Sequence, residues 1–98
     1  MPVTRLDHQQ LQQALDTLEG WQLRDEKLYR EFRFDDFKQA FAFMTRAALW
    51  AEQHNHHPEW FNVYNRVEVS LTTHDADGIS QLDVNFARFL SALYVIGK

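Results

Sequence analysis

The sequence predicts an α+β fold in which a four-stranded antiparallel sheet carries three helices on one face, in the order α-β-β-α-β-β-α. Apolar residues recur at helical spacing in three segments. Two pairs of short segments between them are rich in alternating apolar and aromatic residues, and turn-forming residues or Pro58 separate the elements. At 98 residues, of which 45% are hydrophobic, the chain suits one domain over residues 1–98.

The first helix is predicted to begin at Asp7, whose side chain can accept a hydrogen bond from a first-turn amide. Leu6 is placed to pack on Leu11 across that cap, and Gly20 is suited to end the helix. The polar run 24–27 then separates two short apolar segments, which predicts a hairpin of strands 21–23 and 28–34. The apolar face of the helix consists of Leu11, Ala14, Leu15 and Leu18.

The second helix is expected after Asp35 or Asp36, either of which can cap it, and before Pro58, which disfavours a helical conformation at the preceding residue. Phe43 and Trp50 lie seven residues apart and off the main apolar stripe. They are buried against a partner helix in an oligomer, or they flank the core of their own chain, and both explanations are open. The main stripe, which should face the core, consists of Phe37, Ala40, Phe41, Met44, Ala47, Ala48 and Ala51.

Two further strands, at residues 60–64 and 67–73, are predicted around a turn at Asn65-Arg66. The last helix is expected to begin at Ser80, which can form a capping box with Asp83. Its core face consists of Phe86, Phe89, Leu90 and Leu93.

Composition narrows the possible functions. A net charge of −4 gives no broad attraction for nucleic-acid backbones, so direct nucleic-acid binding is not expected. No stretch approaches the roughly 20 apolar residues of a membrane span, and a cytoplasmic location is the default expectation. With no cysteine and only three glycines, the chain cannot build a thiolate zinc site or a glycine-rich phosphate-binding loop.

The histidines give the main chemical signal, because four of the five gather at the helix-to-strand junction and at the end of a strand. Imidazole can accept and donate protons near pH 7, which suits an elimination of water. Glu52 lies four residues before His56 and would share a helix face with it, so the carboxylate could orient the ring. Spacing alone also leaves open surface histidines or a metal site made of Glu52, His54, His57 and His74, although the chain has no His-Glu-x-x-His motif.

The run from Glu52 to Asn65, EQHNHHPEWFNVYN, resembles the signature of the pterin-4a-carbinolamine dehydratases. The resemblance continues over residues 67–74 and 34–46, so that it covers nearly the whole chain, the first helix least. It implies the α+β fold described above. It also implies homodimers or homotetramers assembled through the second helix, which would make Phe43 and Trp50 interface residues.

The resemblance further implies a substrate, the 4a-hydroxytetrahydropterin released by aromatic amino-acid hydroxylases, which loses water to give a quinonoid dihydropterin. No metal and no organic cofactor are expected. His56, His57 and His74 match the family's functional histidines. His56 and His74 would transfer the protons and His57 would hold the hydroxyl and the ring, with acid and base open, while Glu52 would orient a histidine. The residues that match the family's pterin pocket are Asn55, His56, His57, Thr72, Thr73, His74 and Asp75.

The sequence departs from the family pattern at two positions. Relatives often carry Asp in place of Asn55, and some carry Arg in place of Leu82, so substrate affinity can differ.

Two rival functions stay open beside the dehydratase. One rival is a protein-binding module, since some animal members act as dimerisation cofactors for a homeodomain transcription factor. The other is an enzyme of a different pterin, such as one in molybdopterin metabolism. The three matching histidines favour the dehydratase.

Overall fold

The computed structural model describes residues 3–96 and has the predicted order of elements, which confirms the fold class. The predicted domain limits at residues 1 and 98 lie outside the described residues. The elements are α1 (His8–Asp16), β1 (Gln22–Arg24), β2 (Lys27–Arg33), α2 (Phe37–His54), β3 (Glu59–Val63), β4 (Arg66–Leu71), a short 3-10 helix η1 (His74–Ala76) and α3 (Gln81–Ile96).

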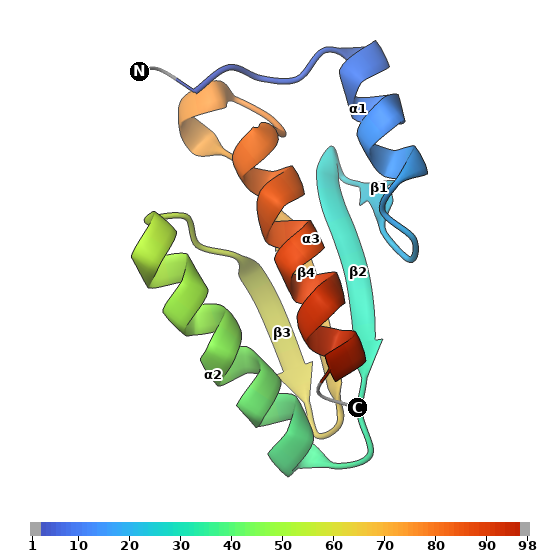
Figure 1. The fold of residues 1–98 in the computed structure, drawn as a ribbon, viewed down its shortest axis with the longest axis vertical. Coiled ribbons are helices and arrows are strands. Elements are labelled where there is room, and N and C mark those ends of the chain that lie inside the picture. The colour runs from blue at the N-terminus through green and yellow to red at the C-terminus, as the bar shows by residue number, and fades with distance from the viewer. Residues whose placement is uncertain (1–2, 97–98) are drawn as a thin grey trace.

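The strands form one antiparallel sheet in the order β1-β2-β4-β3, and α3 runs along its helix-covered face beside α2 (Figure 1). Burial along β4 alternates, as expected for a strand with one covered face. Val67, Val69 and Leu71 are completely buried there, opposite Phe86 and Leu90 of α3, which are also completely buried. None of the helices within residues 3–96 has the length and apolarity needed to span a bilayer.

The first helix begins as predicted and ends earlier. Asp7 accepts a hydrogen bond from the Gln10 amide at 2.8 Å, and the Gln10 side chain accepts one from the Asp7 amide at 2.9 Å. The prediction that Gly20 ends the helix is wrong, because Thr17 caps it and its hydroxyl donates to the carbonyl of Ala14 at 2.8 Å. Leu18 is still buried, at 3% exposed, but in the turn after the helix.

The second hairpin turns one residue earlier than predicted, at Tyr64 and Asn65. Asn65 is fixed against the end of β2, since its side-chain amide donates to the Phe34 carbonyl at 2.9 Å and its own carbonyl accepts the Phe34 amide at 2.9 Å. Arg66 therefore already belongs to β4.

The face that α2 turns toward the core differs from the prediction. Its buried residues are Ala40, Phe43, Ala47 and Ala51, whereas Phe37 and Phe41, which were expected in the core, are 47% and 53% exposed. Three alanines allow the helix to approach the sheet closely, so the packed face is centred on them and not on the largest side chains.

Phe43, predicted as an interface residue, is a core residue. It is 4% exposed and lies with its ring centroid 4.8 Å from that of Phe32 and 5.1 Å from that of Phe34. Trp50 is partly buried at the edge of the core, where it stacks on Phe86 of α3 at 4.3 Å. Phe43 therefore belongs to the core of its own chain, which is the second of the two explanations left open by the sequence.

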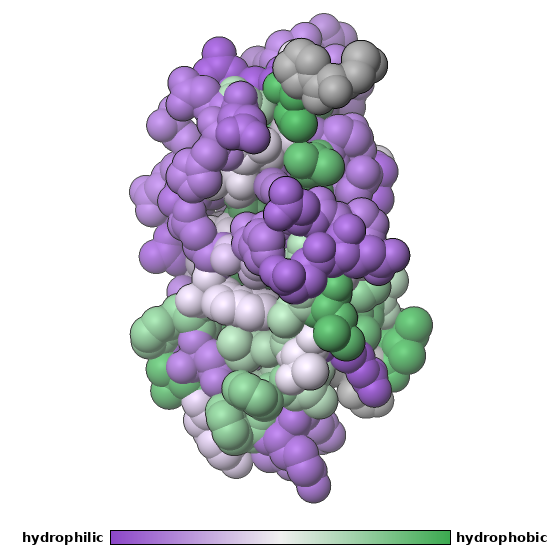
Figure 2. All heavy atoms as spheres, turned by 90° about the vertical axis from the view of Figure 1, so that its left-hand side faces the viewer, coloured by the Kyte–Doolittle hydropathy of each residue, from purple (hydrophilic) through white to green (hydrophobic). Residues whose placement is uncertain are grey.

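Exposed apolar residues instead gather at the end of the molecule where α2 begins, whereas the opposite end of the same side is hydrophilic (Figure 2). The large apolar side chains that α2 exposes are Phe37, Phe41 and Leu49.

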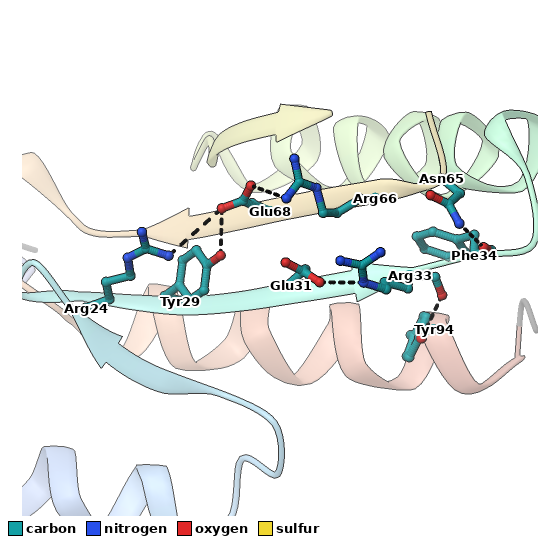
Figure 3. A network of polar contacts seen from close by, with 9 residues as sticks. All are labelled: Arg24, Tyr29, Glu31, Arg33, Phe34, Asn65, Arg66, Glu68 and Tyr94. Carbon is teal, nitrogen blue, oxygen red and sulfur yellow. Dashed lines mark hydrogen bonds and ion pairs between the residues drawn. The ribbon is translucent and has the colours of Figure 1, made fainter. Parts of the chain in front are cut away.

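The face of the sheet without helices carries a network of charged side chains (Figure 3). Glu31 lies opposite Glu68 and Arg33 opposite Arg66, an arrangement of like charges that is unfavourable by itself. Pairs along each strand offset it, with Arg33 to Glu31 at 2.7 Å and Arg66 to Glu68 at 3.6 Å. The Tyr29 hydroxyl donates to Glu68 at 2.6 Å, and this hydrogen bond raises the pKa of Tyr29 above its ordinary value.

Candidate active site

The end of α2 determines where the neighbouring histidines point. Asn55 adopts a left-handed conformation, with φ 49° and ψ 45°, and the His56 amide donates back to the Ala51 carbonyl at 3.0 Å. This is the hydrogen-bonding pattern of a Schellman motif, in which the chain leaves the helix axis within one residue. His56 and His57 therefore follow the helix without belonging to it.

His56 is buried, at 7% exposed, and its Nε2 lies 2.6 Å from Oδ1 of Asp83 at the start of α3. Asp83 is completely buried, and its Oδ2 accepts hydrogen bonds from the Thr73 hydroxyl at 2.7 Å and the Ser80 amide at 2.9 Å. Because the hydroxyl hydrogen of Thr73 goes to Asp83, the Ser80 hydroxyl is the donor in its 2.7 Å bond to Thr73. Four residues from three segments thus form one buried polar network.

This network assigns the tautomer of His56. An ionised carboxylate has no hydrogen to donate, and that of Asp83 already accepts two hydrogen bonds. The hydrogen between the ring and Asp83 is therefore carried by Nε2 of His56. Within residues 3–96, Nδ1 of His56 has no hydrogen bond, and no side-chain nitrogen is both buried and unpaired. Nδ1 is therefore the ring nitrogen that solvent or a ligand can reach.

His57 points elsewhere, and its Nε2 lies 2.7 Å from Oε1 of Glu52. The prediction that Glu52 shares a helix face with His56 is wrong, because the turn at Asn55 removes His56 from the helix. The side chains of His57 and Glu52 are 54% and 79% exposed, so their pair is a surface contact with a modest orienting effect.

His74 begins η1 directly after Thr73, and its side chain is exposed. The bond from Thr73 to Asp83 therefore brings the strand-end segment carrying His74 to the same network that holds His56. Thr72 and Thr73 belong to the same strand-end segment as His74. Within residues 3–96, the side chains of Asn55 and Asp75 form no hydrogen bond or ion pair with His56, His57 or His74.

A cavity of about 550 Å³ opens beside His74, within the range of small-molecule sites. We call it the hairpin cavity. It lies between the segment that precedes α1, the β1–β2 hairpin and the strand-end segment, and its lining consists of residues 5–6, 11, 23, 25–27, 72–74 and 77–79.

The N-terminal wall of the cavity is fixed by a close approach. The Leu6 amide donates to the Ile79 carbonyl at 2.8 Å, and the Arg5 guanidinium donates to the Asp77 carbonyl at 3.3 Å. A Cβ on Gly78 would lie 2.5 Å from Cδ of Arg5, so only glycine allows Arg5 to cross there.

Sequence reasoning missed two parts of this site. Ser80 and Asp83 were assigned to a helix cap, and they do cap α3, but the same carboxylate also holds His56. The capping pattern of Ser80 and Asp83 was visible in the sequence, whereas the burial of Asp83 and its contact with His56 were not. The hairpin cavity carried no sequence signal, because it joins residues 5–6 to residues more than sixty positions later.

His54 contacts Trp50, because its ring stacks on the indole and its Nδ1 lies 2.9 Å from the Trp50 carbonyl oxygen. In the part of the chain that the structure describes, no three histidine or acidic side chains are placed to hold a metal ion together.

Comparison with known proteins identifies the family of this chain. The family pattern of the pterin 4 alpha carbinolamine dehydratases matches residues 4–93. A curated protein of Brucella ovis, provisionally named a pterin-4-alpha-carbinolamine dehydratase, is 48% identical over 95 residues, or 95% of this chain and 98% of its own length.

Two solved structures are also similar. A protein from Brucella melitensis, described as a transcriptional coactivator/pterin dehydratase, matches with a TM-score of 0.91 and 48% identity over 93% of this chain and 99% of its own. A pterin dehydratase-like protein identified as a RuBisCO assembly factor in the alpha-carboxysome matches with a TM-score of 0.63 and 25% identity, over 76% of this chain and 86% of its own. The chain therefore belongs to the pterin-4-alpha-carbinolamine dehydratase family.

Proposed function

We propose that this protein dehydrates 4a-hydroxytetrahydropterins to quinonoid dihydropterins by histidine acid–base catalysis, and so supports the recycling of tetrahydropterin for aromatic amino-acid hydroxylases. The observation that carries the proposal is the network in which a buried carboxylate, Asp83, fixes His56 beside the segment of Thr73 and His74. A chain that only presented a binding surface would not need an oriented, solvent-reaching imidazole at this place.

The reaction requires two proton movements. A base takes the proton from N5 of the ring, the C4a–O bond breaks while an acid protonates the departing hydroxyl, and a C4a–N5 double bond and water result. Nδ1 of His56 is a hydrogen-bond acceptor in the tautomer that Asp83 selects, which suits the base. His74, exposed beside the cavity, is then the proposed acid.

The remaining site residues have binding roles in this proposal. His57, steadied by Glu52, would hold the hydroxyl and the ring. Thr72 and Thr73 would contribute polar contacts to the bound pterin, since both line the cavity beside His74. Asn55 and Asp75 would contribute less.

Assembly into homodimers or homotetramers is part of the proposal, with a changed set of contacts. Phe43 is buried in the core and is no longer a candidate. Phe37, Phe41 and Leu49 are apolar, exposed and on the long helix α2, and they support self-association through that helix.

The second candidate function, a protein-binding module, draws on the same exposed side chains of α2. A structural neighbour of this fold is identified as a RuBisCO assembly factor, so the fold can serve a protein-binding role. The two functions differ in whether histidine substitutions matter, and catalytic measurements separate them.

The test uses His56→Ala and His74→Ala in a coupled assay of 4a-carbinolamine dehydration. Each should lower kcat/KM by about 10² to 10⁴-fold, the usual contribution of one acid–base group. His8→Ala is the matched control, because His8 is exposed at the start of α1 outside the site. Wild-type rates in both site variants would refute the assignment.

A further inference from the structure

We infer that the hairpin cavity selects among pterins by the charge of the group at C6, accepting a short uncharged substituent and disfavouring an anionic one. The inference rests on the proposed function and names three residues that determine specificity: Asp25, Glu26 and Asp77.

The position of His74 places the substituent. C4a and C6 of a pterin are both bonded to N5, so C6 lies two bonds from the reacting carbon and the first atom of its substituent lies three bonds away. His74 lines the hairpin cavity and is the proposed acid at the departing hydroxyl. A substrate whose C4a faces His74 therefore brings its C6 substituent to the mouth of this cavity.

The charges of the lining are unbalanced. Asp25, Glu26 and Asp77 all line the cavity, and none of their carboxylates has a hydrogen bond or ion pair within residues 3–96. Lys27 is paired with Glu59 at 2.6 Å, on the side of the sheet away from the helices. Three free carboxylates thus face one guanidinium, that of Arg5, and an incoming phosphate or carboxylate is repelled.

An uncharged hydroxylated chain suits the same walls. The free carboxylates accept hydrogen bonds from hydroxyl groups, and charged acceptors give the stronger bonds. The apolar part of the lining, Leu6, Leu11, Leu23 and Ile79, can cover the carbon atoms of such a chain.

Backbone conformation singles out Glu26 among the acidic side chains. Asp25, Glu26 and Asp77 have φ of 54°, 63° and 54°, in the left-handed region. Asp tolerates this region, and a two-residue hairpin turn with positive φ at both positions favours Asn-Gly or Asp-Gly, whereas Glu has no special tolerance for it. Turn geometry therefore accounts for Asp25 but not for Glu26 at the tip of the β1–β2 hairpin.

The turn also supplies a variant that should fold well. Combining Asp25→Asn with Glu26→Gly removes both carboxylates and installs the dipeptide that the turn prefers. Combining Asp16→Asn with Asp35→Asn changes the net charge equally, and these exposed residues lie outside the cavity.

The measurement is the dissociation constant of 6-hydroxymethylpterin and of pterin-6-carboxylate, followed by pterin fluorescence. The wild type should prefer the hydroxymethyl compound, and D25N/E26G should reduce that preference by about threefold to tenfold, the scale of two partly screened charges. D16N/D35N should leave it unchanged. Raising the salt should weaken the preference of the wild type, since the charges on the rim are exposed.

The outcomes separate the two proposals. An unchanged preference in D25N/E26G, or equal affinity of the wild type for both compounds, overturns the role of the cavity while dehydration by the wild type still stands. Failure of the folded wild type both to bind either pterin and to accelerate dehydration contradicts the proposed function itself.

Discussion

Asp83 holds the candidate site together at the scale of single residues. Its buried carboxylate accepts hydrogen bonds from His56, from the Thr73 hydroxyl and from the Ser80 amide. A buried charge is costly unless its hydrogen-bonding capacity is used, and here both oxygens have partners. Asp83 is therefore a positioning residue, which fixes the ring of His56 and joins it to the segment of His74.

Asp83→Asn should lower kcat by about 10² to 10⁴-fold with little change in KM, the scale found when an amide replaces the carboxylate that orients a catalytic histidine. An amide cannot accept at both atoms, so either the histidine or the Thr73 and Ser80 donors lose a partner. The free energy of unfolding should fall by about 1–3 kcal/mol.

Two further readouts separate positioning from mere stability. The downfield proton resonance of the hydrogen-bonded His56 ring should vanish in the variant. Glu52→Gln, which alters the exposed partner of His57, should cost less than about tenfold in kcat/KM, because surface pairs contribute at most about 1 kcal/mol. Equal losses in the two variants would remove the special role of Asp83.

At the scale of elements, the end of α2 decides the direction of both neighbouring histidines. The left-handed conformation of Asn55 lets the His56 amide close the helix and separates His56 from Glu52. Asparagine tolerates this conformation better than most residues, and aspartate tolerates it as well. An Asp at this position would therefore keep the geometry and add a charge.

Asn55→Val should destabilise the protein by about 1–2 kcal/mol, because a β-branched residue is strained in the left-handed region, while Asn55→Gly should stay within about 0.5 kcal/mol of the wild type. Urea unfolding measures both. The valine variant should also lose kcat, since a displaced cap misaligns His56. Equal stabilities of the two variants would show that the cap does not depend on the conformation of residue 55.

The same elements show what the sequence can predict. Periodicity and caps located the helices and hairpins, because local hydrogen bonds and apolar spacing determine them. The rotation of α2 was not predictable in this way, because close approach of Ala40, Ala47 and Ala51 to the sheet outweighs the size of Phe37 and Phe41. The helical spacing also predicted a contact of Glu52 with His56, but the helix ends before Asn55 and Glu52 contacts His57 instead.

At the scale of the whole molecule, the exposed aromatic residues of α2 lie apart from the candidate site. Phe37 and Phe41 lie at the start of α2, with their ring centroids 5.5 Å apart, whereas His56 follows its far end. Self-association through the start of α2 would leave the candidate site accessible.

Replacing Phe37 and Phe41 together with Ser should shift the protein toward smaller assemblies in light scattering, because both side chains are about half exposed and gain burial only in an oligomer. Leu23→Ser, which alters an exposed residue of β1 at the edge of the sheet opposite to β3, is the control. An unchanged mass of the double variant would exclude this end of α2 as the interface.

The site could be located from the sequence only through the resemblance around Glu52–Asn65, since histidine spacing alone left surface, metal and catalytic roles open. Its supporting residues come from segments that are distant in the chain. Asp83 reaches His56 across 27 positions and Arg5 reaches Asp77 across 72, and such contacts arise from tertiary packing and not from local pattern.

The most direct test of the account is the rate of 4a-carbinolamine dehydration, followed by ultraviolet absorbance in a hydroxylase-coupled reaction with a chelator present. The account predicts acceleration above the spontaneous rate that the chelator leaves intact and that His56→Ala lowers by about 10² to 10⁴-fold. A folded wild-type protein that leaves the spontaneous rate unchanged would contradict it, and would favour a protein-binding role for this chain.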